Sequence, residues 1–183
     1  TVAYIFAMMA QVGVIAHQFR LVATRSGSDD TAALAVATMA MASIAGRLAG
    51  GWALTWLPSR GFVLGLVIVQ GFALTFYAAA DSTPMLIAAT VIFGVTVGNL
   101  LMMQPLMLAE AFGLKAYGRI YSFNQLFMTA GVAVGPAAVG LLYEWLGGYG
   151  VAFLVMAAAS GFAFVLMMAA GPVRALIDGT GRS

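Results

Sequence analysis

The chain has 183 residues, of which 63% are hydrophobic and only 8% are charged. Eight Lys and Arg residues and six Asp and Glu residues are too few to cover the surface of a soluble fold of this length, so the composition excludes a soluble globular domain and indicates a lipid-covered exterior. The formal net charge of +2 gives no indication of a nucleic-acid partner, and the absence of cysteine excludes disulfides and thiol catalysis.

Polar and turn-forming segments divide the sequence into six apolar runs. A helix of about 20 apolar residues crosses roughly 30 Å of hydrocarbon, so each run is long enough to span a membrane once. We predict an all-α polytopic membrane protein in which residues 1–183 form a single six-helix domain that ends in a cytoplasmic tail. The helices are predicted at residues 2–21, 32–56, 61–80, 85–112, 118–142 and 150–170, and the tail at 171–183.

The helix predicted at 2–21 carries three polar side chains in an apolar run. Gln11 and Gln18 are seven residues apart and therefore lie on one stripe of the helix, and we predict that Gln11 contacts substrate. His17 is the only histidine, and an imidazole titrates near neutral pH. His17 is either a proton-coupling residue or a hydrogen-bonding side chain at the membrane boundary.

The helix predicted at 32–56 contains an arginine in the run MASIAGRLAGGW. Arg47 precedes Trp56 by nine residues, which is roughly 13 Å along the axis. An arginine at that depth costs at least ~2.5 kcal/mol, so we expect it to face a cavity within protein. Arg47 either binds a substrate anion, with Ser43 one turn away, or has a structural role, in which its side chain extends to the cytoplasmic membrane boundary or forms a salt bridge to the other half of the transporter.

The helix predicted at 85–112 combines a small-residue motif with polar groups. Gly94 and Gly98 are spaced for close contact with a neighbouring helix, as are Gly46 and Gly50 in the second helix. Asn99 either forms a hydrogen bond between helices or contacts substrate, and the same two roles are open for Gln104. Near the end of this helix, Glu110 lies close to Lys115 and Arg119 in the sequence, which favours an interfacial ion pair over proton transfer.

The helix predicted at 118–142 has a polar first half and a glycine-rich second half. Gln125 and Thr129 are four residues apart and share a face, which suits the lining of a substrate cavity. Gly131 and Gly135 allow a neighbouring helix to approach, and Pro136 removes a backbone donor and predicts a bend that can serve as a hinge.

The remaining two helices have few polar residues in their interiors, Gln70 in the third and Ser160 in the sixth. We therefore predict that the first, second, fourth and fifth helices line a cavity and that the third and sixth pack outside them. The sequence contains no HExxH, phosphate-binding loop, GxSxG motif or intrahelical pair of carboxylates, so we predict no enzymatic activity, no metal site and no cofactor.

The distribution of basic residues predicts the orientation. When alternate loops are assigned to opposite sides, one side carries two arginines and the other six basic residues, and positively charged loops remain cytoplasmic. Both termini are therefore expected in the cytoplasm. The two groups are Arg20 and Arg25 against Arg47, Arg60, Lys115, Arg119, Arg174 and Arg182, with Asp29, Asp30, Asp81 and Glu144 on the side of the two arginines.

A six-helix unit with short loops, Gly-Arg late in its second helix and a basic second loop resembles half of a major facilitator superfamily transporter, over essentially the whole chain. The runs AVATMAMASIAGRLAGGW, YGRIYSF and GPAAVGLLYEWLGGYGVAF resemble the C-terminal half of the monocarboxylate transporter and oxalate/formate antiporter group. That group places an arginine in the substrate cavity, and Arg47 matches it. Ser43 stands where monocarboxylate transporters often have an aspartate, and no lysine marks the fifth helix as in the antiporters.

The resemblance implies secondary active transport of a small organic anion, by symport or antiport, through alternating access in a bacterial inner membrane. Because the chain starts at Thr1 without a signal peptide, we expect it to begin inside a longer protein and to pair with an N-terminal six-helix half. Two alternatives remain. One is a drug-efflux-like transporter of neutral or cationic compounds in which Arg47 only braces the helices, and the other is a non-transporting six-helix scaffold or truncated half.

Overall fold

A computed structural model describes residues 2–171 of the chain, without the side chains of residues 115 and 116. Its helical stretches are α1 (Val2–Ser26), α2 (Asp29–Ala53), α3 (Ser59–Ala79), α4 (Thr83–Leu146) and α5 (Tyr149–Ala169). α4 contains two membrane spans, Thr83–Leu114 and Tyr117–Leu146, since Gly113 leaves the helical conformation with φ 69° and ψ 170°. The described residues thus contain six helices long and apolar enough to cross a membrane, which confirms the predicted six-helix all-α fold.

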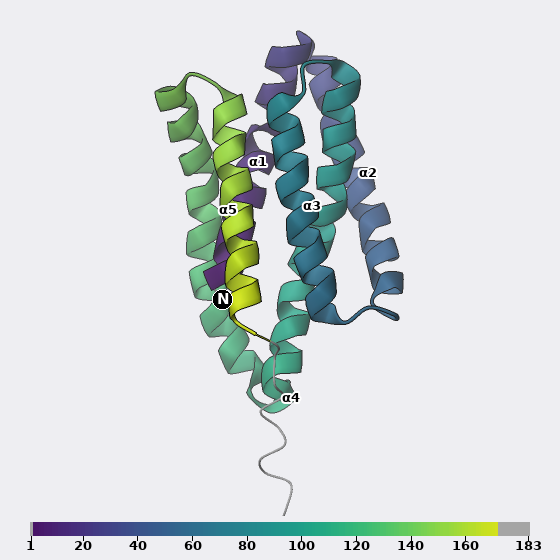
Figure 1. Cartoon of the computed structure of the whole chain (residues 1–183), viewed down its shortest axis with the longest axis vertical. Coiled ribbons are helices and arrows are strands. Elements are labelled where there is room, and N and C mark those ends of the chain that lie inside the picture. The colour runs from purple at the N-terminus through teal and green to yellow at the C-terminus, as the bar shows by residue number, and fades with distance from the viewer. Residues whose placement is uncertain (1, 172–183) are drawn as a thin grey trace, which may run out of the picture.

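The six spans run alternately up and down in one bundle (Figure 1). The start of α1, the α2–α3 connection, the reversal of α4 and the end of α5 lie together at the bottom of Figure 1, which we call the lower end. The other three connections lie at the upper end. α1 packs against α4, α5 and α2, and α3 packs against α5 and α4, so α1 and α4 form the centre of the bundle.

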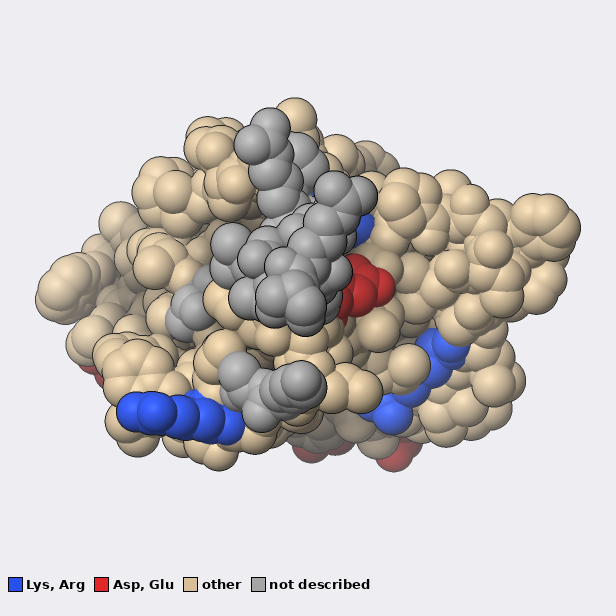
Figure 2. Space-filling view, turned by 90° about the horizontal axis from the view of Figure 1, so that it is seen from below, with Lys and Arg blue, Asp and Glu red and all other residues tan. Residues whose placement is uncertain are grey.

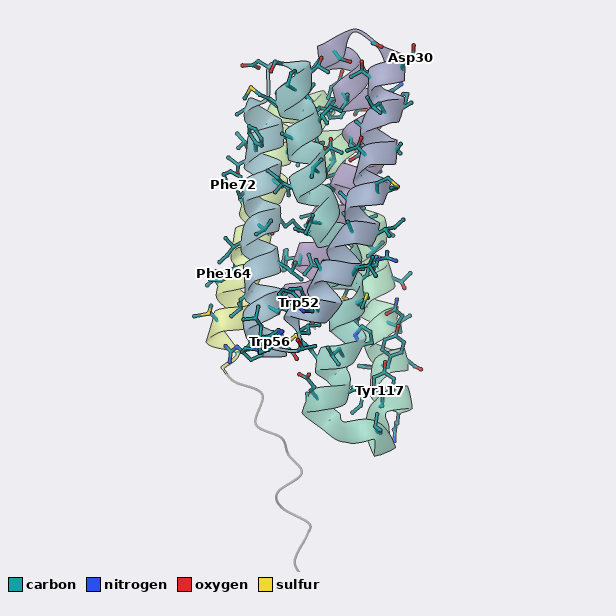
Figure 3. All side chains as sticks on the ribbon, turned by 90° about the vertical axis from the view of Figure 1, so that its right-hand side faces the viewer. Asp30, Trp52, Trp56, Phe72, Tyr117 and Phe164 are labelled. Atoms are coloured by element: carbon teal, nitrogen blue, oxygen red, sulfur yellow. The ribbon has the colours of Figure 1, made fainter. Side chains whose placement is uncertain are left out.

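The thickness of the bundle matches a bilayer. Asp30 lies at the upper end of α2, and Trp52 and Trp56 lie near its lower end (Figure 3). The 22 residues from Asp30 to Trp52 span roughly 33 Å, close to the roughly 30 Å of a hydrocarbon core. Both tryptophans are more than 70% exposed, as expected for indole rings at a membrane–water interface.

The interior is apolar and divides into an upper and a lower cluster. In the upper cluster the buried ring of Tyr77 contacts Phe93 and Phe153 edge to face, at centroid distances of 6.1 and 5.8 Å. Many of the surrounding residues are alanines, which allow helices to approach closely where lipid supplies no hydrophobic drive for their association. The clusters join α1, α3, both spans of α4 and α5 into one body.

The helix ends extend further into polar sequence than the hydropathy pattern predicts. The segment from 22 to 31, between the first two predicted helices, is helical except at Gly27 and Ser28. The polar side chains in it find local partners: Thr24 Oγ1 donates to the carbonyl oxygen of Arg20 at 2.7 Å, and Ser28 accepts a hydrogen bond from the amide of Thr31. A polar side chain that forms a hydrogen bond with the backbone of its own helix does not require the chain to leave the helical conformation in order to be hydrogen-bonded by water.

The same holds at the end of the second span of α4, where the predicted break from 143 to 149 is mostly helical. The span ends in a left-handed Gly147, at φ 72°, whose amide donates to the carbonyl of Tyr143 at 3.0 Å. That glycine supplies the conformation that closes the last turn. The predicted cytoplasmic tail, with Arg174 and Arg182, lies outside the described residues apart from Gly171.

Two arginines hold helix ends together. Arg25 of α1 donates to the carbonyl oxygens of Tyr77 and Ala80, both at 2.7 Å, and of Ala78 at 3.1 Å, at the upper end of α3. At the lower end, Arg60 of α3 donates to the carbonyls of Met167 and Met168 in α5 at 3.0 and 3.2 Å. Each guanidinium meets the negative end of a helix dipole and donates to carbonyls at the C-terminal end of the helix.

Candidate functional site

The first contact relevant to function is the crossing of α2 with the first span of α4. Their backbones touch at glycines: a methyl group on Gly46 would lie 2.8 Å from the carbonyl oxygen of Val95, and one on Gly94 would lie 2.8 Å from that of Met39. Gly50 instead faces the side chain of Asn99. The predicted packing glycines of these two helices therefore lie in one direct interface.

Asn99 is a structural residue of this crossing. It is 3% exposed, and its amide group donates to the carbonyl oxygens of Gly46 and Val95, both at 2.8 Å. Of the two roles that the sequence left open, the structure supports the hydrogen bond between helices. Asn99 is unsuited to substrate binding because its donors are used and its side chain is covered by α2.

Arg47 and Ser43 flank the crossing on α2. A methyl group on Gly98 would lie 2.7 Å from Ser43 Oγ and also 2.7 Å from Arg47 Cγ, so the missing side chain of Gly98 makes room for the arginine to lie across α4. Ser43 is 7% exposed, whereas Arg47 is exposed on the outside of the bundle. Within residues 2–171, the arginines that form side-chain hydrogen bonds are Arg25 and Arg60, and Arg47 is not among them.

A second glycine contact joins α1 to the second span of α4. A methyl group on Gly13 would lie 2.8 Å from the carbonyl oxygen of Gly135, and one on Gly131 would clash with the side chain of Ile5. Gly131 and Gly135 thus lie in a helix–helix contact, as the GxxxG spacing suggested. Gly13 was not singled out in the sequence, although it is the only glycine inside the run predicted at 2–21.

Pro136, next to Gly135, does not break the helix. Gly113 is the only residue with non-helical dihedral angles inside the described α4, so the predicted bend at Pro136 is not visible as a change of backbone conformation. The carbonyl oxygen of Pro136 accepts a hydrogen bond from Nε2 of His17 at 3.0 Å. The proline lies where α1 fastens the second span.

His17 therefore has a structural partner on each side. Besides its bond to Pro136, its ring lies 5.7 Å from the ring of Tyr149 at the start of α5. The geometry matches a hydrogen-bonding side chain near the membrane boundary, and among the described residues its bond leads to a backbone carbonyl. A role in proton coupling gains no support from these contacts.

Glu110 differs from the prediction in its partner. It is exposed at the lower end, where Oε1 accepts a hydrogen bond from Ser59 Oγ at 2.6 Å, so it connects the first span of α4 to the start of α3. The side chain of Lys115, one of its two predicted ion-pair partners, lies outside the described residues. Arg119, the other, lines a cavity.

Gln11 and Gln18 point into the core rather than toward an open face. They are 0% and 1% exposed, and the side-chain nitrogen and oxygen of Gln11 have no hydrogen-bond partner among the described residues. Gln18 accepts a bond from the Tyr77 hydroxyl at 3.4 Å. The predicted substrate contact of Gln11 does not fit this position, since α1 is covered on that side by its neighbours.

Gln70 and Ser160, the isolated polar residues of the two outer helices, bond to each other. Gln70 Nε2 donates to Ser160 Oγ at 3.3 Å and to the carbonyl of Ala7 at 2.9 Å, and Ser160 donates to the carbonyl of Val67. These bonds tie α3, α5 and α1 together, consistent with a packing role for the outer pair.

Gln125 and Thr129 are exposed on the outward face of the second span of α4. Thr129 Oγ1 donates to the backbone carbonyl of Gln125 at 2.9 Å. The side chain of Gln125, with its amide group, is exposed. The structure thus divides the six predicted substrate residues in two. Arg47, Gln125 and Thr129 are accessible, whereas Gln11, Ser43 and Asn99 are buried in helix contacts.

The described residues contain no group of three or more His, Cys, Asp or Glu side chains that could hold a metal ion. What they present is an uncovered arginine at membrane depth and polar side chains on neighbouring central helices. Together with the six-span bundle, these features define a polytopic membrane protein. The family model of the Major Facilitator Superfamily matches residues 1–177, and the chain belongs to that family, whose members carry out secondary transport. Comparison with curated proteins gives no match.

Proposed function

We propose that this chain is the C-terminal half of a secondary transporter for a small, monocarboxylate-like organic anion, and that Arg47 binds the carboxylate. The observation that carries the proposal is the exposure of Arg47 at membrane depth. Arg47 lies five residues above the interfacial Trp52, which is roughly 8 Å into the bilayer along α2.

An exposed guanidinium is costly in contact with lipid alone, unless its side chain reaches the interface. Insertion scales assign about 2.5–3.5 kcal/mol to an arginine near the centre of a membrane helix, and such residues face the interior of a bundle or a water-filled cavity. The apolar side chains beside Arg47 are also uncovered: Ile44 is 56% exposed and Leu48 is 74% exposed. These observations support a second six-helix half that covers this face of α2 and leaves an aqueous cavity at Arg47.

A carboxylate suits the arginine for two reasons. The planar guanidinium can donate two parallel hydrogen bonds to it, and the pair then neutralises the charge within the cavity. Gln125 and Thr129, on the exposed face of the second span of α4, supply neutral hydrogen-bonding groups for the remainder of a small substrate. Gly98 contributes indirectly, because it lets the arginine side chain lie across the first span of α4.

Alternating access would come from rocking of this bundle as one body against the other half. The lower end, which carries Arg60 and Arg119, would face the cytoplasm under the positive-inside rule. Protease added to sealed right-side-out or inside-out vesicles would test this orientation. Cleavage at the lower end should occur only in inside-out vesicles, whose cytoplasmic face is exposed to the protease.

The central test uses the intact transporter that contains this chain, reconstituted into liposomes with a panel of labelled short-chain monocarboxylates. Removal of a charge-assisted hydrogen bond costs about 1.5–3 kcal/mol, so Arg47→Ala should raise the apparent KM roughly 10- to 150-fold. Arg47→Lys keeps the charge but loses the bidentate geometry, and should show a smaller defect.

Arg20→Ala is the matched control, since Arg20 is exposed at the opposite, upper end of the bundle. It should transport normally. Normal uptake of every monocarboxylate by Arg47→Ala would exclude the proposed role of Arg47. Equal transport of neutral or cationic compounds by the unaltered protein would favour an efflux-type substrate instead.

A further inference from the structure

A groove with a volume of about 430 Å³ lies between the two outer helices, α3 and α5. Small residues leave it open: a methyl group on Gly71 would lie 3.8 Å from the carbonyl oxygen of Ala157, and one on Gly161 would meet no atom within 4 Å. Ile68 and Phe72, which also line the groove, are 54% and 61% exposed. Among the described residues, none from α1, α2 or α4 lines it, so the groove is separate from the side chains proposed to bind substrate.

The groove is apolar and lies near the middle of the membrane. Gly71 is 12 residues from the start of α3 and eight from its end, which is roughly 18 and 12 Å along the axis. Thr75 is the one polar side chain among the described residues that line the groove, and its hydroxyl already donates to the carbonyl oxygen of Gly71 at 2.9 Å. The lining therefore favours a hydrocarbon ligand over water or a polar molecule.

Arg60 lies at the lower end of this groove. It is the second residue of α3, and Leu64 and Ile68 follow it at intervals of four residues, so all three lie along one side of the helix. Its Nη2 donates to the carbonyl oxygens of Met167 and Met168 at 3.0 and 3.2 Å, at the end of α5. The guanidinium therefore bridges the same two helices that form the groove.

The Arg60 side chain has hydrogen-bonding capacity to spare. A guanidinium carries five N–H donors on three nitrogens, and within residues 2–171 the hydrogen bonds of Arg60 all come from Nη2. Glu110, an acidic residue at the same end, accepts its hydrogen bond from Ser59. Because Arg60 is also partly exposed, Nη1 and Nε are available to an anion.

We propose that the groove and Arg60 together bind an anionic phospholipid of the phosphatidylglycerol type, with its phosphate at Arg60 and one acyl chain between α3 and α5. Phosphate oxygens accept charge-assisted hydrogen bonds from a guanidinium. Basic sites between membrane helices on the cytoplasmic side bind anionic head groups, and the lower end is the side proposed above to face the cytoplasm. Figure 2 shows that basic side chains at this end lie apart on a mostly uncharged surface, which suits a singly charged head group.

The distances along α3 agree with the dimensions of one leaflet. A leaflet contributes about half of the roughly 30 Å of hydrocarbon, or about 15 Å. Ile68 and Gly71 lie eight and eleven residues beyond Arg60, which is roughly 12 and 17 Å deeper. A full-length acyl chain of a lipid held at Arg60 therefore ends in the groove, whereas a short chain stops below it.

A second copy of the chain fits this face less well than a lipid. Two copies with the same orientation in the membrane would be related by an axis along the membrane normal, so both Arg60 side chains would lie at the same end of their interface. Two like charges would then approach each other, whereas one lipid phosphate neutralises one arginine.

The bound lipid would fasten α5 to α3. Its chain contacts both helices, and its phosphate binds an arginine that already joins them, so occupancy stabilises the bundle relative to any state in which α5 separates. The site lies away from Arg47, and the inference does not depend on the identity of the transported substrate.

The test uses the purified protein in a neutral detergent and a phosphatidylglycerol probe with a photoreactive diazirine in one acyl chain. Cross-links should map to residues 67–75 and 154–164. Dioleoyl phosphatidylglycerol should displace the probe, and dioleoyl phosphatidylcholine should do so about fivefold less well, as expected for the loss of one net charge attracted to one arginine. Dihexanoyl phosphatidylglycerol, which has the same head group on short chains, should not displace it.

Two kinds of variant separate the head-group site from the groove. Arg60→Gln should weaken phosphatidylglycerol about fivefold and leave phosphatidylcholine unchanged, and Arg60→Lys should restore most of the difference. Gly161→Leu places a side chain in the groove without touching Arg60, and should weaken both lipids. Its matched control is Gly65→Leu, since a methyl group on Gly65 also meets no atom within 4 Å and Gly65 does not line the groove. This control and Arg47→Ala should bind the probe as the unaltered protein does.

Thermal unfolding of each variant without lipid shows whether the bundle is intact; if Arg60→Gln fails to fold, the two lipids and Gly161→Leu decide the question. The proposal is overturned if phosphatidylcholine competes as well as phosphatidylglycerol, if Gly161→Leu binds the probe normally, or if the cross-links lie elsewhere. A dimer in detergent that Gly161→Leu dissociates would also overturn it, because the groove would then hold a second copy.

Discussion

The contact between α1 and the second span of α4 predicts a large effect from a single methyl group. In Gly135→Ala, the new Cβ would lie 3.0 Å from the backbone nitrogen of Gly13 and would clash with the carbonyl oxygen of Met9. Both atoms belong to the backbone of α1, so no side-chain rotation can relieve the contact. The two helices would have to separate.

The magnitude follows from two opposing terms. Overpacking of a tight contact costs about 1–3 kcal/mol. Replacement of glycine by alanine inside a helix gains up to about 1 kcal/mol. The control is Gly65→Ala in α3, where a new methyl group would meet no atom within 4 Å and only the second term applies. Gly135→Ala should therefore be less stable than Gly65→Ala by about 1–3 kcal/mol.

The assay is thermal unfolding of the purified protein in detergent, followed by intrinsic tryptophan fluorescence. Since the chain has no cysteine, an exposed-thiol dye would not report on it. At about 2–4 °C per kcal/mol for a chain of this size, the two variants should differ in Tm by roughly 2–12 °C. Equal Tm values would refute the close contact of α1 with Gly135. A second control, Gly161→Ala in α5, also meets no atom within 4 Å and should behave like Gly65→Ala.

Three further substitutions test other contacts by the same assay. Asn99→Ala removes one hydrogen bond to α2 and one within α4 and should cost about 1–3 kcal/mol, whereas Thr38→Ala, which removes only a bond within α2, should cost under about 1 kcal/mol; equal losses would contradict the role of Asn99. Arg25→Ala removes three hydrogen bonds to carbonyls at the end of α3, of which the Tyr77 carbonyl keeps a bond from the amide of Ala80, and should lower stability by about 1.5–3 kcal/mol, in contrast to Arg20→Ala. Gln11→Met replaces an amide without protein partners by an apolar side chain of similar length, so it should be neutral or stabilising, and a loss above about 1 kcal/mol would show that the amide is satisfied.

Hydropathy was sufficient to predict the number of spans, because each must cover the same hydrocarbon thickness whatever it packs against. It was less informative about the helix ends. Arg25 and Thr24 read as loop residues, yet both remain in α1, since their side chains bond to backbone carbonyls. Backbone acceptors leave no trace in a sequence, so the contacts of Arg25 and Arg60 could not be anticipated from residue types.

The residue types of the candidate site could be predicted from the sequence, but the face of the helix on which each side chain lies could not. Asn99 and Gln125 are equivalent in a sequence, each a polar group in an apolar helix. One is buried against a glycine of α2 and the other faces outward. In a membrane helix that is apolar all round, no amphipathic period shows which face packs against protein, so only the structure separates the two. Arg47 was identifiable because a charge at that depth requires an explanation in either environment.

The two arginine contacts at opposite ends of α3 bear on how the chain assembles in the membrane. Arg25 and its acceptors are at most 55 residues apart, so their contact can form once the third helix has been inserted. The contact of Arg60 can form only after its acceptors, 107 and 108 residues further along the chain, have been inserted. A nascent chain that stops before α5 would therefore hold a folded upper end beside a lower end with an unsatisfied guanidinium, and insertion of the last helix closes the bundle from below.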